Sequence, residues 1–233
     1  MCGQTLGLAL ARAGTRNTRI IDRALRGLEG PWGTYARMDT LRSPKHLTGP
    51  DFGFPALTFR AWYEAQHGLE GWERLDKIAT ADWRAYLLWV RDTAGIAVEN
   101  GTEAVDLEPG AAFVRVCLRG ARGAETVHAR KLVLAGGRDG SGARSLPLFP
   151  SLTAAPSGGA GRVFHASDAI DFARFEGGSV GVLGAGASAF DNAAVALEAG
   201  ARGSSVLAPG AVAADQQVEM GGISRLLSRL SRS

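Results

Sequence analysis

The stretch Ser179-Val-Gly-Val-Leu-Gly-Ala-Gly-Ala-Ser-Ala189 decides the fold prediction, because a glycine turn follows directly on a short apolar run. Its first five residues predict a buried β-strand, and residues 190–199 predict a helix. Between them, Gly184-x-Gly186-x-x-Ala189 has the spacing of the dinucleotide-binding fingerprint. A strand, a glycine turn and a helix in this order predict part of a Rossmann-like unit.

Each position of this turn has a physical reason to carry a small residue. Gly184 permits the tight turn, Gly186 lets the backbone approach a pyrophosphate, and Ala189 keeps the helix close to the strand. The start of the helix offers unpaired N–H groups and partial positive charge to phosphate. The motif therefore favours dinucleotide binding, with an ordinary tight turn between strand and helix as the alternative. Ser188 is not in a G-x-S-x-G elbow, so a serine hydrolase is disfavoured.

The N-terminal region predicts the second half of another βαβ unit. Residues 3–13 predict a short helix, Gly14 is placed to end it, and residues 18–23 predict a strand that ends near Asp22. An acid at that position accepts hydrogen bonds from an adenosine ribose in dinucleotide-binding units, although a solvated carboxylate at a strand end is an equal alternative. The strand and the two glycines expected before this helix are absent from the sequence.

The middle of the chain changes from helical to strand periodicity. Residues 58–68 and 80–94 predict helices, and residues 96–135 alternate between apolar and polar side chains with Gly and Pro turns between them. Residues 131–135, Lys-Leu-Val-Leu-Ala, form an apolar run before Gly136 and predict a strand buried on both faces.

Composition excludes several classes of protein. The 233 residues are 45% hydrophobic and 21% charged with a net charge of +3, which is typical of a globular domain and too balanced for a dedicated nucleic-acid binder. Cys2 and Cys117 form no CxxC pair, so a disulfide framework or cysteine metal site is not predicted. With no apolar run of about 20 residues and no signal peptide, we expect a cytoplasmic protein with neither a membrane partner nor a metal.

The order of these segments resembles the flavin-containing monooxygenase-like FAD/NAD(P)-binding oxidoreductases, which are flavoproteins with two dinucleotide-binding domains. The resemblance covers roughly residues 1–203. It lies in Met1-Cys-Gly3 with its helix, Ile20-Ile-Asp22, Gly30-Pro-Trp32, Thr40-Leu-Arg-Ser-Pro-Lys-His46, Leu132-Val-Leu-Ala-Gly-Gly137, Phe164-His-Ala-Ser167 and Gly184-Ala-Gly-Ala-Ser-Ala-Phe-Asp-Asn192. The family's Ala-Thr-Gly at a strand end is replaced here by Ala135-Gly136-Gly137.

The resemblance implies that FAD binds the first unit and NADP or NAD the second. The residues it assigns to FAD are Gly3 (as the third glycine of the FAD turn), Gln4, Asp22, Arg23, Trp32 and Arg42. Those it assigns to NAD(P)H are Gly184, Gly186, Ala187, Ser188 and Ala189. The implied chemistry is hydride transfer from NAD(P)H to FAD and then oxygen activation towards a small-molecule substrate, for which we assign no catalytic side chain.

The predicted fold class is α/β, with two interleaved Rossmann-like units and a β-meander, both units incomplete. The expected parts are a partial FAD-binding domain over 1–155, the start of an NAD(P)-binding domain over 156–203, and a tail over 204–233. Codons for this tail, shifted by one base, can encode a family-like sequence, so we interpret the tail as frameshifted or disordered. The chain is then an incomplete gene product.

Two other functions remain to be weighed. The missing FAD glycines favour a non-catalytic nucleotide-binding remnant or an interaction protein. A pyridine-nucleotide disulfide reductase shares the fold, but it needs a redox cysteine pair that this sequence lacks. The oligomeric state is not predicted.

Overall fold

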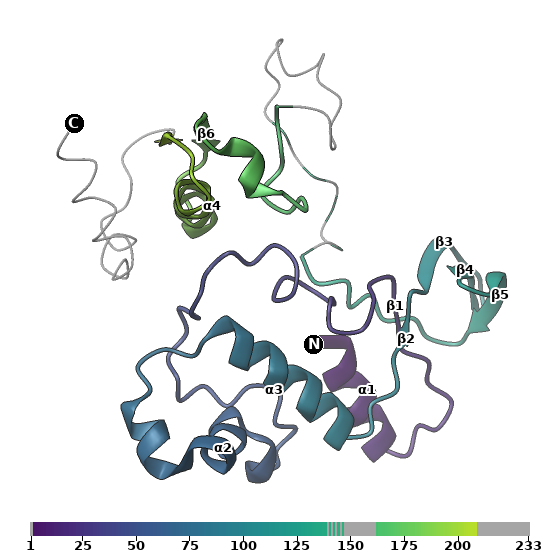
Figure 1. Ribbon diagram of the computed structural model, residues 1–233. Helices are drawn as coiled ribbons and strands as arrows, with labels where there is room; N and C mark the ends of the chain where they lie inside the picture. The colour runs from purple at the N-terminus through teal and green to yellow at the C-terminus, as the bar shows by residue number, and fades with distance from the viewer. Residues whose placement is uncertain are drawn as a thin grey trace. The chain divides into compact units, whose positions relative to one another are not determined.

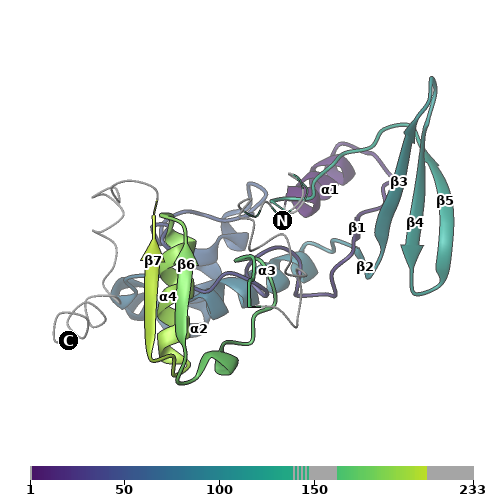
Figure 2. The same ribbon diagram turned by 90° about the horizontal axis from the view of Figure 1, so that it is seen from above.

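The computed structural model describes residues 2–138, 140, 142, 144, 146 and 162–208 (Figures 1 and 2). The chain divides into two compact units, one of Met1–Thr34 with Asp39–Ala143 and one of Tyr35–Met38 with Arg144–Ser233. Both units contain helices and strands, as the α/β prediction requires. In the described ranges, no helix has the length and apolar character needed to cross a bilayer.

A parallel strand pair and one helix begin the first unit. Helix α1 (Cys2–Arg12) leads into β1 (Ile21–Asp22), which pairs in parallel with β2 (Glu99–Asn100) so that Asp22 lies opposite Asn100. The helix lies close to the chain just before β1, because a Cβ built on Gly7 would be 2.2 Å from Cδ1 of Ile20. Asp22 therefore lies at the carboxyl end of a parallel pair whose entry, at Ile20, packs closely against α1.

The core of this unit is aromatic and lies between two helices. Helix α2 (Phe59–Arg74) follows the short 3₁₀ turn η1 (Pro55–Leu57), and α3 (Thr80–Thr93) comes next. The buried side chains are Leu41, Phe59, Trp72, Ile78, Trp83, Tyr86 and Val90. Both predicted helices are confirmed, but α2 runs past the predicted end at residue 68 through a kink at Gly68, where φ is +71°.

The predicted β-meander is present as an antiparallel sheet in the order β3 (Glu103–Pro109), β4 (Val114–Gly120) and β5 (Gly123–Ala129). Val116 and Leu118 are buried on one face of β4. On the other face, Arg119 pairs with Glu103 across the ladder at 2.9 Å. The alternation seen in the sequence thus separates an apolar face from a charged one.

The strand predicted over residues 131–135 is not formed. These residues have no strand assignment, and Val133 and Leu134 are 58% and 78% exposed. An apolar strand of this kind is stable where neighbouring strands pair with it and both its faces are covered. Among the described residues, the parallel sheet consists of β1 and β2 alone, and this segment pairs with neither of them.

The second unit is a strand–helix–strand arrangement, preceded by the 3₁₀ turn η3 (Phe172–Phe175). Strand β6 (Ser179–Leu183) and strand β7 (Gly203–Leu207) pair in parallel, and helix α4 (Ala187–Glu198) lies against them (Figure 2). Leu183 and Leu207, which are opposite each other, are 53% and 57% exposed. The prediction that β6 is buried is therefore wrong for one face, because α4 covers only the other.

Strand β7 also extends past residue 203, so the expected domain boundary falls inside a strand. Residues 209–233 of the expected tail lie outside the described residues.

One arginine links the parallel pair to the meander. Arg19 donates hydrogen bonds to Glu99 at 2.7 and 2.8 Å and to Glu125 at 2.9 and 3.1 Å. These bonds raise the pKa of Arg19 and lower the pKa of both glutamates. Because Glu99 lies in β2 and Glu125 in β5, the guanidinium holds the edges of two sheets together.

We expect Arg19→Met to lower the melting temperature at pH 7 by roughly 2 °C, since all three side chains are partly solvated. Lowered glutamate pKa values stabilise the fold above the pKa of the unfolded chain, about 4.3. The difference between variant and parent should thus begin to shrink below that value and be lost as the pH falls through the lowered pKa values of Glu99 and Glu125. Thermal unfolding at several pH values measures it. Arg74→Met, which removes an exposed pair with Glu70, is the control. A pH-independent difference would contradict the prediction.

Candidate functional site

The turn between β6 and α4 has the geometry that its glycines predict. Gly184 has a φ of +143°, which L-residues rarely adopt, and its N–H donates to the carbonyl of Leu207 at 2.9 Å. Ala189 is buried, and its Cβ would be 3.5 Å from a Cβ on Gly184. The turn is therefore tight, fastened to the end of β7, and closely packed on the helix.

Gly186 leaves an open space in front of α4. Apart from its two chain neighbours, a Cβ built there would meet no atom of the described residues within 4 Å. Gly186 is the N-cap residue of the helix, no side chain caps it, and the first turn contains no acidic residue. Backbone N–H groups and the positive end of the helix dipole thus lie beside open space, an arrangement that favours binding of an anion such as pyrophosphate.

The predicted NAD(P)-binding residues are therefore brought together in one turn. Ala187 and Ser188 begin the helix, and the carbonyl of Ser188 accepts a hydrogen bond from Nδ2 of Asn192 at 2.7 Å. The strand–turn–helix prediction is confirmed here. Binding of a dinucleotide by these residues stays a prediction.

The second candidate site is the carboxyl edge of β1 and β2 in the first unit. Oδ1 of Asp22 accepts the N–H of Ala24 at 2.8 Å, and the Asp22 carbonyl accepts the N–H of Thr102 at 3.0 Å. Among the described residues, Oδ2 of Asp22 accepts no hydrogen bond, which leaves that oxygen to accept a ribose hydroxyl. The strand-end carboxylate is thus held by its own turn and fits the acceptor role.

The other residues predicted to bind FAD occupy three parts of this unit. Gly3 and Gln4 are partly buried on α1, and a Cβ on Gly3 would be 3.4 Å from Cβ of Ala135. Arg23 is exposed beside Asp22. Trp32 meets Trp83 edge-on in the aromatic core, with ring centroids 6.2 Å apart, and Arg42 follows the buried Leu41. The structure thus joins Trp32 to the core rather than to the Asp22 turn.

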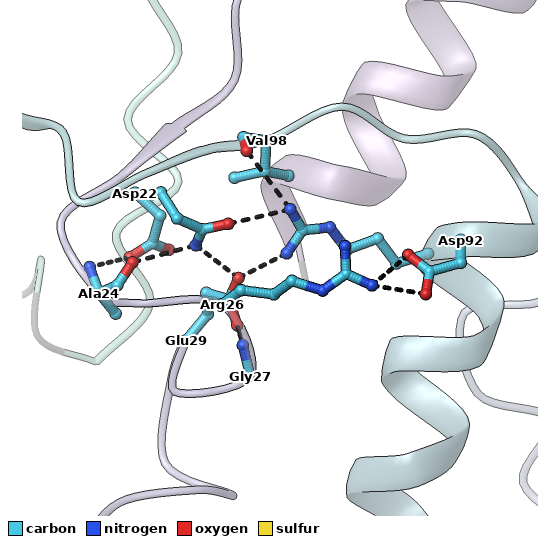
Figure 3. Close-up of polar contacts among 9 residues, drawn as sticks. Asp22, Ala24, Arg26, Gly27, Glu29, Asp92 and Val98 are labelled. Carbon is cyan, nitrogen blue, oxygen red and sulfur yellow. Dashed lines mark hydrogen bonds and ion pairs between the residues drawn. The ribbon is translucent and has the colours of Figure 1, made fainter.

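Sequence reasoning missed a buried polar network behind Asp22 (Figure 3). Arg91 on α3 donates from Nη1 to Glu29 at 2.7 Å and from Nη2 to Asn100 at 2.9 Å. Burial would raise the pKa of Glu29, but hydrogen bonds from Asn100 and Gly27 and the charge of Arg91 lower it overall. Glu29 is therefore a carboxylate. No spacing in the sequence relates these three residues, so only the fold could reveal the network.

A second residue missed by the sequence analysis is Gly7. Close approach of helix to strand is the task of the third glycine in a dinucleotide-binding turn. In the first unit, the close approach occurs at Gly7 against Ile20, while a Cβ on Gly3 would make only ordinary contacts. The assignment of Gly3 to the cofactor stays a prediction.

No protein-family model matches the sequence. The chain is, however, 48% identical over 198 residues to the FAD-dependent urate hydroxylase of Xanthomonas campestris pv. campestris, an alignment that covers 85% of this chain. The chain is thus similar in sequence to a FAD-dependent hydroxylase, and its fold is that of the flavin-containing monooxygenase-like proteins. It spans 41% of the length of the urate hydroxylase.

Solved structures of this class have the same fold. The flavin-containing monooxygenase from Stenotrophomonas maltophilia matches with a TM-score of 0.65 and 19% identity over 90% of this chain and 55% of its own. The ornithine N-hydroxylase from Kutzneria sp. 744, solved with reduced FAD, NADP⁺ and L-ornithine, matches with a TM-score of 0.63 and 17% identity. That match covers 95% of this chain and 56% of the hydroxylase. At these identities the likeness supports the fold alone.

The two glycines of the α4 turn should respond differently to alanine. Gly184→Ala places a side chain at a φ of +143° and should destabilise the protein by about 1–2 kcal/mol. Gly186→Ala has an ordinary φ of −83° and open space, so the free energy of unfolding should change by less than about 0.5 kcal/mol. Urea denaturation of both variants measures the difference. Equal losses of stability would show that the turn is not formed as described.

Proposed function

We propose that this chain is an FAD-dependent, NAD(P)H-oxidising oxidoreductase of flavin monooxygenase type. The observation that carries the proposal is the 48% identity to a FAD-dependent urate hydroxylase across 85% of the chain. The open turn at the N-terminus of α4 supports it independently, because it offers amide groups where a pyrophosphate needs them. The chain spans under half of that relative, so the whole activity is part of the proposal.

Two groups of residues would hold the cofactors. The turn from Gly184 to Ala189 and the first amides of α4 would bind the pyrophosphate of NADP or NAD. Asp22 would accept the adenosine ribose hydroxyls of FAD, with Gly3, Gln4, Arg23, Trp32 and Arg42 assigned to FAD by family resemblance. When bound, FAD supplies hydride acceptance from NAD(P)H and oxygen chemistry. The chain's own part is to bind and orient the nucleotides.

The domain assignment follows from these two groups. We assign residues 1–155 to FAD binding and the region from 156 to the end of β7 to NAD(P) binding. The substrate is a small molecule, and the first one to test is urate, because the homologue is named for it.

A second candidate function is nucleotide binding without turnover. It is favoured by the exposed apolar segment Leu132–Ala135, which has no partner strand among the described residues beside the candidate FAD edge. A flavin held at an incompletely paired edge would be poorly shielded from water. The α4 turn does not depend on that edge and would still bind a pyridine nucleotide.

The two functions are distinguished by the spectrum and the turnover of the purified protein. Oxidation of NADPH or NADH, followed by absorbance with and without added FAD and urate, should be FAD-dependent and stimulated by urate. A visible flavin spectrum should persist after gel filtration. Nucleotide binding by calorimetry without FAD-dependent oxidation would instead establish the non-catalytic candidate. If the protein neither binds a nucleotide nor oxidises NADPH or NADH, both candidate functions are refuted.

A variant of the α4 turn tests the nucleotide site directly. Gly186→Val would fill the open space in front of the helix, so NADPH affinity should fall at least about tenfold, while stability changes little. Gly181→Ala in β6 is the matched control, since a Cβ there also meets nothing within 4 Å. The affinity is measured by calorimetry. If Gly186→Val bound NADPH as tightly as Gly181→Ala, the pyrophosphate could not lie at this turn.

A further inference from the structure

The polar network behind Asp22 joins the loop after β1 to α3 and β2, and its central side chain is buried. Arg91 is 4% exposed, and Oε1 of Glu29 accepts from both Arg91 and Nδ2 of Asn100 at 2.7 Å. Oε2 of Glu29 accepts the N–H of Gly27 at 2.7 Å. Three donors therefore fix one carboxylate that belongs to the loop following β1.

This network is connected to Asp22 through one residue. Nδ2 of Asn100 also donates to the carbonyl of Ala24 at 3.0 Å, and the N–H of Ala24 donates to Oδ1 of Asp22 at 2.8 Å. Asn100 is the residue of β2 that lies opposite Asp22 in the parallel ladder. The side chain of Asn100 thus joins the buried ion pair to the turn that orients the Asp22 carboxylate.

Stability alone is a poor reason for such an arrangement. Desolvation of a buried ion pair costs about as much as its attraction returns, and apolar replacements of similar volume are often as stable. The same loop also carries Arg26, which pairs with Asp92 on α3 at 2.5 Å, but both of those side chains are about half exposed. The exposed pair fastens the loop loosely, whereas the buried network fixes its geometry.

We propose that Arg91, Glu29 and Asn100 position the carboxylate of Asp22 for the 2′-hydroxyl of an adenine nucleotide. Arg91 and Asn100 are positioning residues, because they act through Ala24 and do not touch the nucleotide. The inference rests on the proposed function, in which Asp22 binds the adenosine ribose of FAD. It adds the residues that set the selectivity of that edge for ribose.

The test compares ADP with 2′-deoxy-ADP by calorimetry, on the full chain carrying Gly186→Val so that the α4 turn is blocked. This parent should bind ADP about tenfold more tightly than the deoxy analogue. Asp22→Asn should bring the ratio of the two affinities close to one. Asn100→Ala, which leaves the Arg91–Glu29 pair in place, should do the same while changing affinity for 2′-deoxy-ADP less than about threefold.

Two further variants separate positioning from folding. Arg91→Lys keeps the charge but cannot reach Glu29 and Asn100 together in the guanidinium geometry, so it too should lower the ratio. Arg26→Met removes the exposed pair between the same loop and α3 and should keep the ratio of the parent. Melting curves establish that each variant is folded at the titration temperature. Should Asn100→Ala not fold, Arg91→Lys alone decides.

Each outcome has a distinct meaning. If the parent does not prefer ADP, or Asp22→Asn keeps the preference, the ribose assignment in the proposed function is wrong and this inference falls with it. If Asp22→Asn removes the preference while Asn100→Ala and Arg91→Lys retain it, only the positioning role is wrong. An equal loss of affinity for both nucleotides in those variants would mean that the network merely supports the fold, which also overturns the inference.

Discussion

Close packing of a helix onto a parallel strand is the constraint on which both candidate sites depend. In the first unit, α1 approaches the chain before β1 so closely that Gly7 has no room for a Cβ beside Ile20. In the second, Ala189 of α4 packs against Gly184 at the end of β6. At the second contact, these small residues bring the N-terminus of α4 to the carboxyl edge of β6, which is where backbone amides can meet a phosphate.

The two edges are then completed in different ways. At the α4 turn, the candidate phosphate site is formed by backbone atoms alone. The hydrogen bond that holds the turn in place runs from the N–H of Gly184 to the carbonyl of Leu207. At the Asp22 edge, side chains from distant segments are needed, because Arg91 and Asn100 must both reach the loop after β1. An anion can be bound by amides that the chain always carries, whereas recognition of a hydroxyl requires a carboxylate held in one orientation.

The local parts of this structure could be predicted from the sequence, and the long-range parts could not. The turn at residues 184–189 and the helices α2 and α3 were predictable because glycine spacing and helical periodicity act over a few residues. The buried Arg91 was not, since Glu29 lies far along the chain from it and no periodic spacing relates it to Asn100. The prediction of a strand at residues 131–135 is wrong for a related reason. An apolar run predicts burial, but burial needs neighbouring strands and helices that the run itself does not specify.

The exposed apolar residues of the two units follow from the same physics. Val133 and Leu134, in the apolar run before Gly136, and Leu183 and Leu207, on the open face of β6 and β7, are the kind of side chains that a larger parallel sheet would bury. A parallel sheet buries both of its faces, so a pair of strands with one helix leaves half of its apolar surface in water. The α4 turn, which we propose binds phosphate, does not share this dependence, because its geometry is set by glycines and by hydrogen bonds within one strand–helix–strand unit. We therefore expect nucleotide affinity at this turn to be separable from the stability of the sheet.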